Sequence, residues 1–443
     1  MTLTSYSEAP GETLAPGTLF RFATAGSVDD GKSTLVGRLL HDSKAILSDH
    51  LAAVEHTSAQ RGFGGDAGGL DLALLTDGLR AEREQGITID VAYRYFATAA
   101  RSFILADCPG HVQYTRNMVT GAATADAVIV LVDVRHGVVE QTRRHLAVLA
   151  LLRIPHVIVA LNKIDLVDSV STVVEQVADE VRRTALAIGI ENVHVVPVSA
   201  LAGDNVSTRS SRTPWYHGPT LLELLESLPA VATSEETLTS DLRLPVQLAL
   251  RPQGALAPGL DGEKFRDYRA AAGRIVSGTV SVGDTVSIHP GTVSSVVTRI
   301  DVAGRNVSTA HAPQSVAISL ADNTDLANGA LIASVNTLPE PRSRISTTVF
   351  WLSEQPGKTG DRLLAKWGSA TVQARLGVIE GKRDLDTLDM VPADRFDTND
   401  IGAVDIDLAT PLPVDRFATH RGTGAFILIH PQTGATLAAG TIS

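Results

Sequence analysis

The chain has 443 residues, of which 44% are hydrophobic and 20% charged, and this is enough for two to four domains with cores of their own. Its net charge of −11 argues against a protein that functions mainly by binding nucleic acid. Its single cysteine excludes a disulfide framework, no apolar run reaches membrane-spanning length, and the polar residues 1–17 lack a signal-peptide pattern. We therefore expect a cytoplasmic protein with no membrane segment and with a flexible tail over residues 1–17.

The first predicted elements are a strand over Leu19–Ala25, a glycine-rich loop over Gly26–Ser33 and a helix over Thr34–Leu40. The loop has the pattern G-x-x-x-x-G-K-S, in which backbone N–H groups surround a phosphate at a helix N-terminus. Lys32 is expected to reach the β- and γ-phosphates, and the Ser33 hydroxyl to bind Mg²⁺. The residues predicted to contact the nucleotide here are Gly26, Ser27, Val28, Asp29, Asp30, Gly31, Lys32, Ser33 and Thr34.

Two features follow before the next strand. The segment Arg61–Gly69 is dense in glycine and is predicted to be mobile, as part of a nucleotide-dependent switch. The segment Arg83–Asp90 contains Thr88, whose hydroxyl is expected to complete the metal shell only while the γ-phosphate is present.

The predicted strand Ser102–Ala106 runs into the motif Asp107-Cys108-Pro109-Gly110-His111. Asp107 is expected to hold Mg²⁺ through a water molecule, the Gly110 N–H to sense the γ-phosphate, and His111 to orient the attacking water. The predicted metal ligands are thus Ser33, Thr88 and Asp107, and the predicted catalytic residues are His111, Thr88 and Lys32.

Two further strand ends predict the base. The apolar strand Val157–Leu161 is followed by N-K-x-D, and a buried Asp165 carboxylate can accept from N1–H and the 2-amino group of guanine. Adenine offers neither donor, so the pattern favours GTP. After the strand Val195–Val198, the Ala200 N–H is placed to donate to guanine O6. The predicted base-binding residues are Asn162, Lys163, Asp165, Ser199, Ala200 and Leu201.

This motif series resembles the GTPase domain of the elongation factor Tu superfamily. Within it the chain is similar to the GTP-binding large subunit of bacterial sulfate adenylyltransferase (ATP sulfurylase), whereas translation factors typically carry histidine where Ser27 and Asp30 stand. The passages that carry the narrower resemblance are Gly26–Thr34, Gly37–Lys44, Leu72–Leu79, Ala81–Phe96, Gly203–Val206 and Pro214–Glu223.

The resemblance implies an enzyme subunit with GTP and Mg²⁺ as cofactors. It couples GTP hydrolysis to the reaction of ATP and sulfate to adenylylsulfate and diphosphate, the first step of sulfate assimilation. The motifs S-G-G-x-D-S and H-x-G-H are absent, so we expect adenylyl transfer in a separate small ATP-binding subunit and a heterodimer without nucleic acid. A translation factor and a stand-alone regulatory GTPase are the alternative readings.

The resemblance also raises secondary roles. It matches Val28 and Ile87 to an apolar gate beside the catalytic histidine, with simple packing as the alternative. Arg80 and Arg83 either supply positive charge to the transition state or lie solvated on a helix.

The predicted fold is an α/β P-loop GTPase domain over residues 18–232, with a mostly parallel sheet and helices on both faces. A linker over 233–243 leads to two small antiparallel β-barrels, over 244–337 and 338–443. Gly273–Val286 is predicted to be rich in hairpins. Gly357–Thr359 resembles the end of a phosphate loop, but Leu352 replaces its first glycine, so we expect a turn there and no kinase activity.

Overall fold

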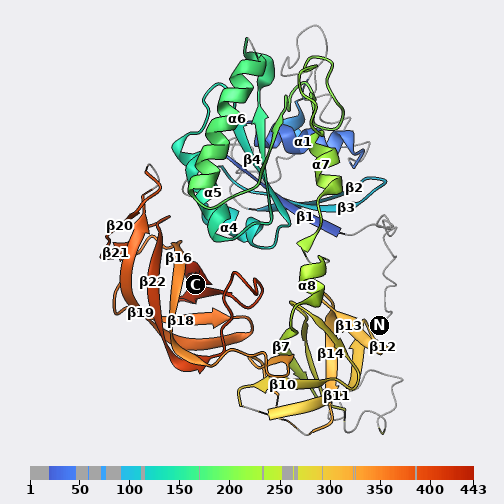
Figure 1. Cartoon of the computed structure of the whole chain (residues 1–443), viewed down its shortest axis with the longest axis vertical. Coiled ribbons are helices and arrows are strands. Elements are labelled where there is room, and N and C mark those ends of the chain that lie inside the picture. The colour runs from blue at the N-terminus through green and yellow to red at the C-terminus, as the bar shows by residue number, and fades with distance from the viewer. Residues whose placement is uncertain are drawn as a thin grey trace, which may run out of the picture. The chain divides into compact units, whose positions relative to one another are not determined.

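The structure is a computed structural model. It describes residues 19–45, 58, 71–75, 91–110, 115–168, 170–231, 234–251, 263, 268–291, 293–322, 324, 326–384 and 387–443. The chain separates into two compact units, Met1–Ala230 and Val231–Ser443 (Figure 1). None of the helices in the described ranges has the length and apolar character needed to cross a membrane.

The first unit is built on a six-stranded sheet in the order β2-β3-β1-β4-β5-β6. Only β2, at one edge, runs antiparallel to its neighbour, and the other pairs are parallel. The strands are β1 (Leu19–Gly26), β2 (Ala92–Ala97), β3 (Ser102–Asp107), β4 (Ala127–Asp133), β5 (His156–Asn162) and β6 (Val193–Pro197). The carboxyl ends of the parallel strands therefore all lie at the same end of the sheet; these strands are β1, β3, β4, β5 and β6.

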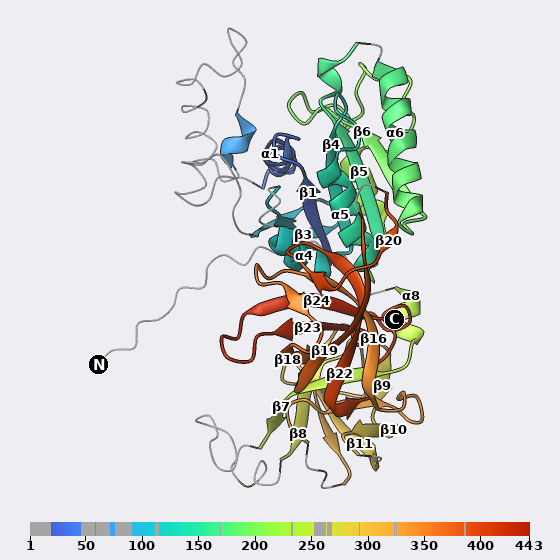
Figure 2. The same cartoon turned by 90° about the vertical axis from the view of Figure 1, so that its left-hand side faces the viewer.

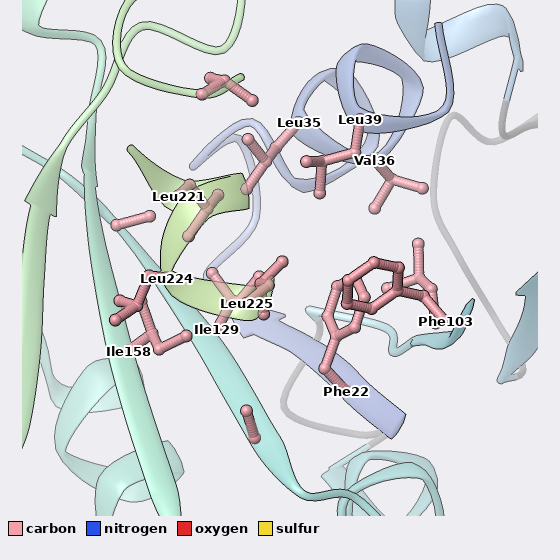
Figure 3. Packing of buried hydrophobic residues seen from close by; sticks show 14 of the residues in the cluster. Phe22, Leu35, Val36, Leu39, Phe103, Ile129, Ile158, Leu221, Leu224 and Leu225 are labelled. Carbon is pink, nitrogen blue, oxygen red and sulfur yellow. The ribbon is translucent and has the colours of Figure 1, made fainter. Parts of the chain in front are cut away.

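Helices cover both faces of this sheet, and Figure 2 shows α1 and α6 on opposite sides. The helices are α1 (Lys32–Asp42), η2 (Leu72–Leu75), α4 (Thr115–Ala123), α5 (Glu140–Leu151), η4 (Ile164–Leu166), α6 (Val170–Ala187) and α7 (Leu221–Ser227). Leucines of α1 and α7 pack against apolar side chains of β1, β3, β4 and β5 in one cluster (Figure 3). The α/β class with a mostly parallel sheet is confirmed.

Close packing explains one glycine of α1. A Cβ on Gly37 would collide with the carbonyl oxygen of Leu72, so the absent side chain lets η2 approach the helix. The apolar face of α1, with Leu35, Val36 and Leu39 fully buried, then fixes the helix on the sheet.

The segment before α7 has a structural role. Thr220 and Glu223 form a reciprocal capping box at the start of the helix. The Tyr216 hydroxyl donates to the carbonyl of Pro219 at 2.8 Å, and its half-buried ring packs on the core of the first unit. Gly218 lies under that ring, where any Cβ would collide with it.

The second unit begins with α8 (Glu235–Thr239) and contains two barrels. In the first, the sheet order β10-β15-β7-β8-β14-β11 is closed by pairing of β10 with β11, and β12 adds to β11. Its strands are β7 (Arg243–Leu250), β8 (Ala270–Arg274), β9 (Thr279–Ser281), β10 (Thr285–His289), β11 (Val293–Val302), β12 (Arg305–Val307), β13 (Thr309–His311), β14 (Ser315–Leu320) and β15 (Leu331–Ser334).

The second barrel repeats this plan. The order β18-β23-β24-β16-β22-β19 is closed by pairing of β18 with β19, and β20 adds to β19. Its strands are β16 (Arg342–Trp351), β17 (Gly357–Lys358), β18 (Arg362–Trp367), β19 (Ala370–Arg383), β20 (Met390–Val391), β21 (Arg395–Phe396), β22 (Ile401–Leu412), β23 (Ala425–Ile429) and β24 (Thr436–Ile442). Both predicted antiparallel barrels are confirmed.

The hairpins predicted within Gly273–Val286 are wrong. The strands β8, β9 and β10 are consecutive but do not pair with one another, since β8 pairs with β7 and β14, β9 with β13, and β10 with β11 and β15. Turn residues such as Gly283, with φ of 99°, here redirect the chain between sheets. Gly357 and Lys358 form β17, and the chain turns at Gly360, whose φ is 95°.

Candidate nucleotide-binding site

The loop between β1 and α1 has the backbone of a phosphate cradle. Gly31 precedes α1 with φ of 92°, and Asp29 has φ of 63°, so both residues are left-handed. A Cβ on Gly31 would collide with the side-chain amide of Asn162. The carboxylate of Asp30 accepts the Ser27 N–H at 2.7 Å and thereby braces the loop from within. Burial raises the pKa of Asp30, against the hydrogen bond from Ser27 and the charge of Lys32, which lower it.

Lys32 lies inside this loop with 8% of its surface exposed. Its ammonium donates to the carbonyls of Gly26 at 2.9 Å and Ser27 at 2.7 Å. Burial lowers the pKa of Lys32, while the nearby carboxylates of Asp30 and Asp107 act in the opposite direction. A Cβ on Gly110 would collide with the Lys32 ammonium, so the end of β3 approaches the loop closely because residue 110 is glycine.

Asp107 ends β3 directly beside β1. Its register partner on β1 is Thr24, and the Thr24 hydroxyl donates to the Asp107 carboxylate at 2.8 Å. Asp107 is 2% exposed, and Ser33 is the second residue of α1. A carboxylate and a hydroxyl are oxygen donors of the kind that Mg²⁺ accepts alongside water and phosphate oxygens. The donor set therefore fits the predicted metal.

The N-K-x-D segment ties the phosphate loop to the neighbouring strand ends. The Asn162 side chain donates to the carbonyl of Asp30 at 2.8 Å and accepts the Ala200 N–H at 2.9 Å. The Lys163 ammonium donates to the carbonyl of Asp29. Three loops that are far apart in sequence are thus joined by two side chains.

The prediction that the Asp165 carboxylate is buried is wrong in this structure. Asp165 is exposed rather than buried, and Leu201 is 50% exposed. The Ala200 N–H, which sequence reasoning assigned to guanine O6, donates to Asn162 in this structure. Ser199 is fully buried and its hydroxyl accepts the Ala202 N–H at 3.1 Å, so it shapes the turn.

One buried residue of the site was not predicted. Asp133, at the end of β4, is 3% exposed and pairs with Lys163 at 3.0 Å and Arg135 at 2.6 Å. Burial would raise the pKa of Asp133, but hydrogen bonds from Arg135 and Lys163 outweigh it and hold the pKa below its usual range. The available signal was a carboxylate at the end of an apolar strand, a position that Asp107 also occupies, but without a motif such as Asp107–His111 after it.

Not every predicted residue can be placed. Thr88 and His111 lie outside the described residues, as do Arg80, Arg83, Ile87 and the segment Arg61–Gly69. Within the site, Val28 is 42% exposed. Cys108 is fully buried, and burial raises the pKa of its thiol.

Two family models match this chain. Residues 18–233 match the elongation factor Tu GTP binding domain, and residues 344–443 match the GTP-eEF1A C-terminal domain-like family. A solved structure titled as sup35 complexed with GDP covers 99% of this chain and 96% of its own at 20% identity, with a TM-score of 0.43.

Several curated relatives align along nearly the whole chain. The sulfate adenylyltransferase subunit 1 of Alteromonas mediterranea is 43% identical over 96% of this chain and 86% of its own length. That of Colwellia psychrerythraea is 44% identical over 96% and 88%. The bifunctional enzyme CysN/CysC of Mycobacterium tuberculosis is 44% identical over 96% of this chain and 67% of its own. With this similarity and an elongation factor Tu-type GTP-binding domain, the chain belongs to the family of sulfate adenylyltransferase subunit 1.

Proposed function

We propose that this chain is the GTP-hydrolysing subunit of a cytoplasmic sulfate adenylyltransferase. It couples GTP hydrolysis to the reaction of ATP and sulfate to adenylylsulfate and diphosphate in a separate small subunit, the first step of sulfate assimilation. The single observation that carries the GTP-binding part of the proposal is the junction of three loops at one end of the sheet, where Asn162 and Lys163 hold the phosphate loop against the Ser199–Leu201 turn. The similarity to sulfate adenylyltransferase subunit 1 supports the reaction.

Each residue then has a defined task. Lys32 pairs with the β- and γ-phosphates, in exchange for its bonds to two loop carbonyls. Asp165 accepts N1–H and the 2-amino group of guanine. Ser33 and Thr88 would hold Mg²⁺ directly and Asp107 through a water molecule, and the bound ion would neutralise phosphate charge. His111 orients the attacking water.

Coupling to the partner follows from the γ-phosphate contacts. Thr88 and the Gly110 N–H hold their positions only while the γ-phosphate is present, and hydrolysis releases them. The two nucleotide states therefore present different surfaces to the small subunit and shift the population of its active conformation.

The test measures GTP hydrolysis by the purified chain mixed with the candidate small subunit, with and without ATP plus sulfate. We expect hydrolysis to rise only when both substrates are present. Stimulation by ribosomes instead would select a translation factor, and adenylylsulfate formed by this chain alone would refute the division of labour.

The same assay tests His111. His111→Ala is expected to lower GTP turnover by about 10²-fold or more, with little change in GTP affinity, because orienting water acts in the transition state. Equal losses of turnover and affinity would give His111 a structural role.

A further inference from the structure

The last turns of α1 contact the turn that follows β6. The Arg38 guanidinium donates to the carbonyl of Ala200 at 3.2 Å and to that of Leu201 at 2.5 Å. Four residues later, the Asp42 carboxylate accepts the Ser207 hydroxyl at 2.7 Å and lies 3.7 Å from Arg38. Arg38 and Asp42 are only about one-fifth exposed.

The other hydrogen bonds of this turn do not fix its tip, residues 200–203, relative to the rest of the site. The Gly203 N–H donates to the carbonyl of Ser199 at 2.7 Å, and the Ala202 N–H donates to the Ser199 hydroxyl, so these bonds shape the turn internally. The flanks of the turn are anchored in the core at Val198 and Val206. Among the described residues, the tip is tied to the rest of the site by Asn162, through the Ala200 N–H, and by Arg38.

We propose that Arg38, supported by Asp42, is a positioning residue for recognition of the guanine O6 edge. The inference rests on the proposed GTP site. It gives the C-terminal half of α1 a role in base recognition, in addition to the role of its N-terminus at the phosphates. In this arrangement the Ala200 N–H, shared with Asn162, meets O6, and Arg38 holds the carbonyl of the same residue from behind. Asp165 reads the 2-amino group from a different loop and does not depend on Arg38.

The chemistry of arginine suits this task. Its planar guanidinium presents donors in a fixed fork, so one side chain holds two successive carbonyls with charge-assisted hydrogen bonds. Lysine offers one point charge without that fork. The helix that carries Arg38 begins at Lys32 and spans 11 residues, about 16 Å at 1.5 Å per residue. One rigid element therefore supports both the phosphate end and the base end of the pocket.

The experiment compares the affinities of three nucleotides for the full chain. GTP has both O6 and the 2-amino group. In 6-thio-GTP a weakly accepting sulfur replaces O6, and ITP lacks the 2-amino group. For Arg38→Ala we expect the GTP to 6-thio-GTP affinity ratio to fall about five-fold, the value of one neutral hydrogen bond, while the GTP to ITP ratio stays unchanged. Arg38→Lys should restore part of the first ratio.

Arg182→Ala is the matched control, because Arg182 lies in the first unit in an exposed ion pair with Asp179 on α6. It should leave both ratios unchanged. If Arg38→Ala does not fold, Ser207→Ala removes the second contact of α1 and should lower the first ratio alone, by less. The inference is wrong if these variants keep the GTP to 6-thio-GTP ratio, or if both ratios fall together. A wild-type chain that does not prefer GTP over ATP would instead refute the proposed function.

Discussion

Lys32 in the first unit and Arg243 in the second are both cations with less than a tenth of their surface exposed, but their partners differ. Arg243 uses five hydrogen bonds: two to the Asp415 carboxylate, two to Thr337 and one to the carbonyl of Leu242. Lys32 donates to two loop carbonyls. Arg243 is thus paired directly with a buried carboxylate. The hydrogen bonds of Lys32 go to carbonyls, with the carboxylates of Asp30 and Asp107 nearby, so its ammonium can still pair with an anion.

The hydrogen bonds of Arg243 join the two barrels of the second unit and the segment between them. Arg243 begins β7 in the first barrel, Asp415 follows β22 of the second barrel, and Thr337 lies in the segment that joins the two barrels. The Thr423 hydroxyl donates to Asp415 at 2.5 Å as a further partner. A buried, fully hydrogen-bonded pair of this kind is costly to break from one side.

The largest expected effect is on stability of the second unit. Arg243→Met leaves Asp415 buried without its cation, and we expect the free energy of unfolding to fall by about 4 kcal/mol. Denaturant unfolding followed by tryptophan fluorescence measures this, since Trp351 and Trp367 lie in the second barrel. GTP binding should not change.

A variant of an exposed arginine tests whether burial is the cause of this loss of stability. Arg344→Met removes an arginine that also pairs with an aspartate in the second barrel, Asp407 at 2.6 Å, but Arg344 is 65% exposed. Exposed pairs contribute little, so its unfolding midpoint should stay close to that of the wild type. Equal losses for both variants would contradict the distinction drawn from burial.

Lys32→Met should give the opposite pattern. We expect a loss of GTP affinity and turnover of about 10²-fold to 10³-fold, because the buried cation that we propose to bind phosphate is removed. Without nucleotide, the unfolding free energy of the first unit should be unchanged or higher, since methionine relieves the burial of a charge. A large loss of stability without nucleotide would make Lys32 a structural cation like Arg243.

The smallest expected effect is on the pH dependence of stability, through a buried and uncharged histidine. His145, in α5, is fully buried, its Nε2 lies 2.9 Å from the Gln141 amide, and burial lowers its pKa to about 3. A depressed folded pKa gives stability that is complete above the unfolded value near 6.5 and is lost as pH falls toward 3. As pH falls from 6.5 to 5, we expect the stability lost through this residue per pH unit to rise from about 0.7 kcal/mol to about 1.4 kcal/mol, because the unfolded chain binds half a proton at pH 6.5 and nearly a full proton at pH 5.

The measurement is the pH dependence of unfolding of the first unit, compared with His145→Gln, which does not titrate. The wild-type slope should be the steeper one. Parallel slopes would mean that His145 is already accessible to protons in the folded chain.

Much of the first unit was predictable because its signals are local. An apolar run followed by a motif of glycine, lysine or aspartate placed β1, β3 and β5 to within one or two residues at each end. The barrels were predictable as a class, but the pairing within Gly273–Val286 was not. Alternation and turns define where strands lie, whereas partners of antiparallel strands depend on contacts distant in sequence.

The candidate site also has parts that were predicted from the sequence and parts that only the tertiary structure shows. Sequence patterns by themselves predicted the phosphate loop, the carboxylate Asp107 at the end of β3 and the N-K-x-D segment after β5, because each is a short motif with a fixed spacing. Only the tertiary structure decided that Asp133 anchors Lys163, that Arg38 holds the turn at Ala200, and that Arg243 meets Asp415. These contacts join residues 30, 162 and 172 positions apart, respectively, and the chain specifies them through packing of whole elements rather than through any local pattern.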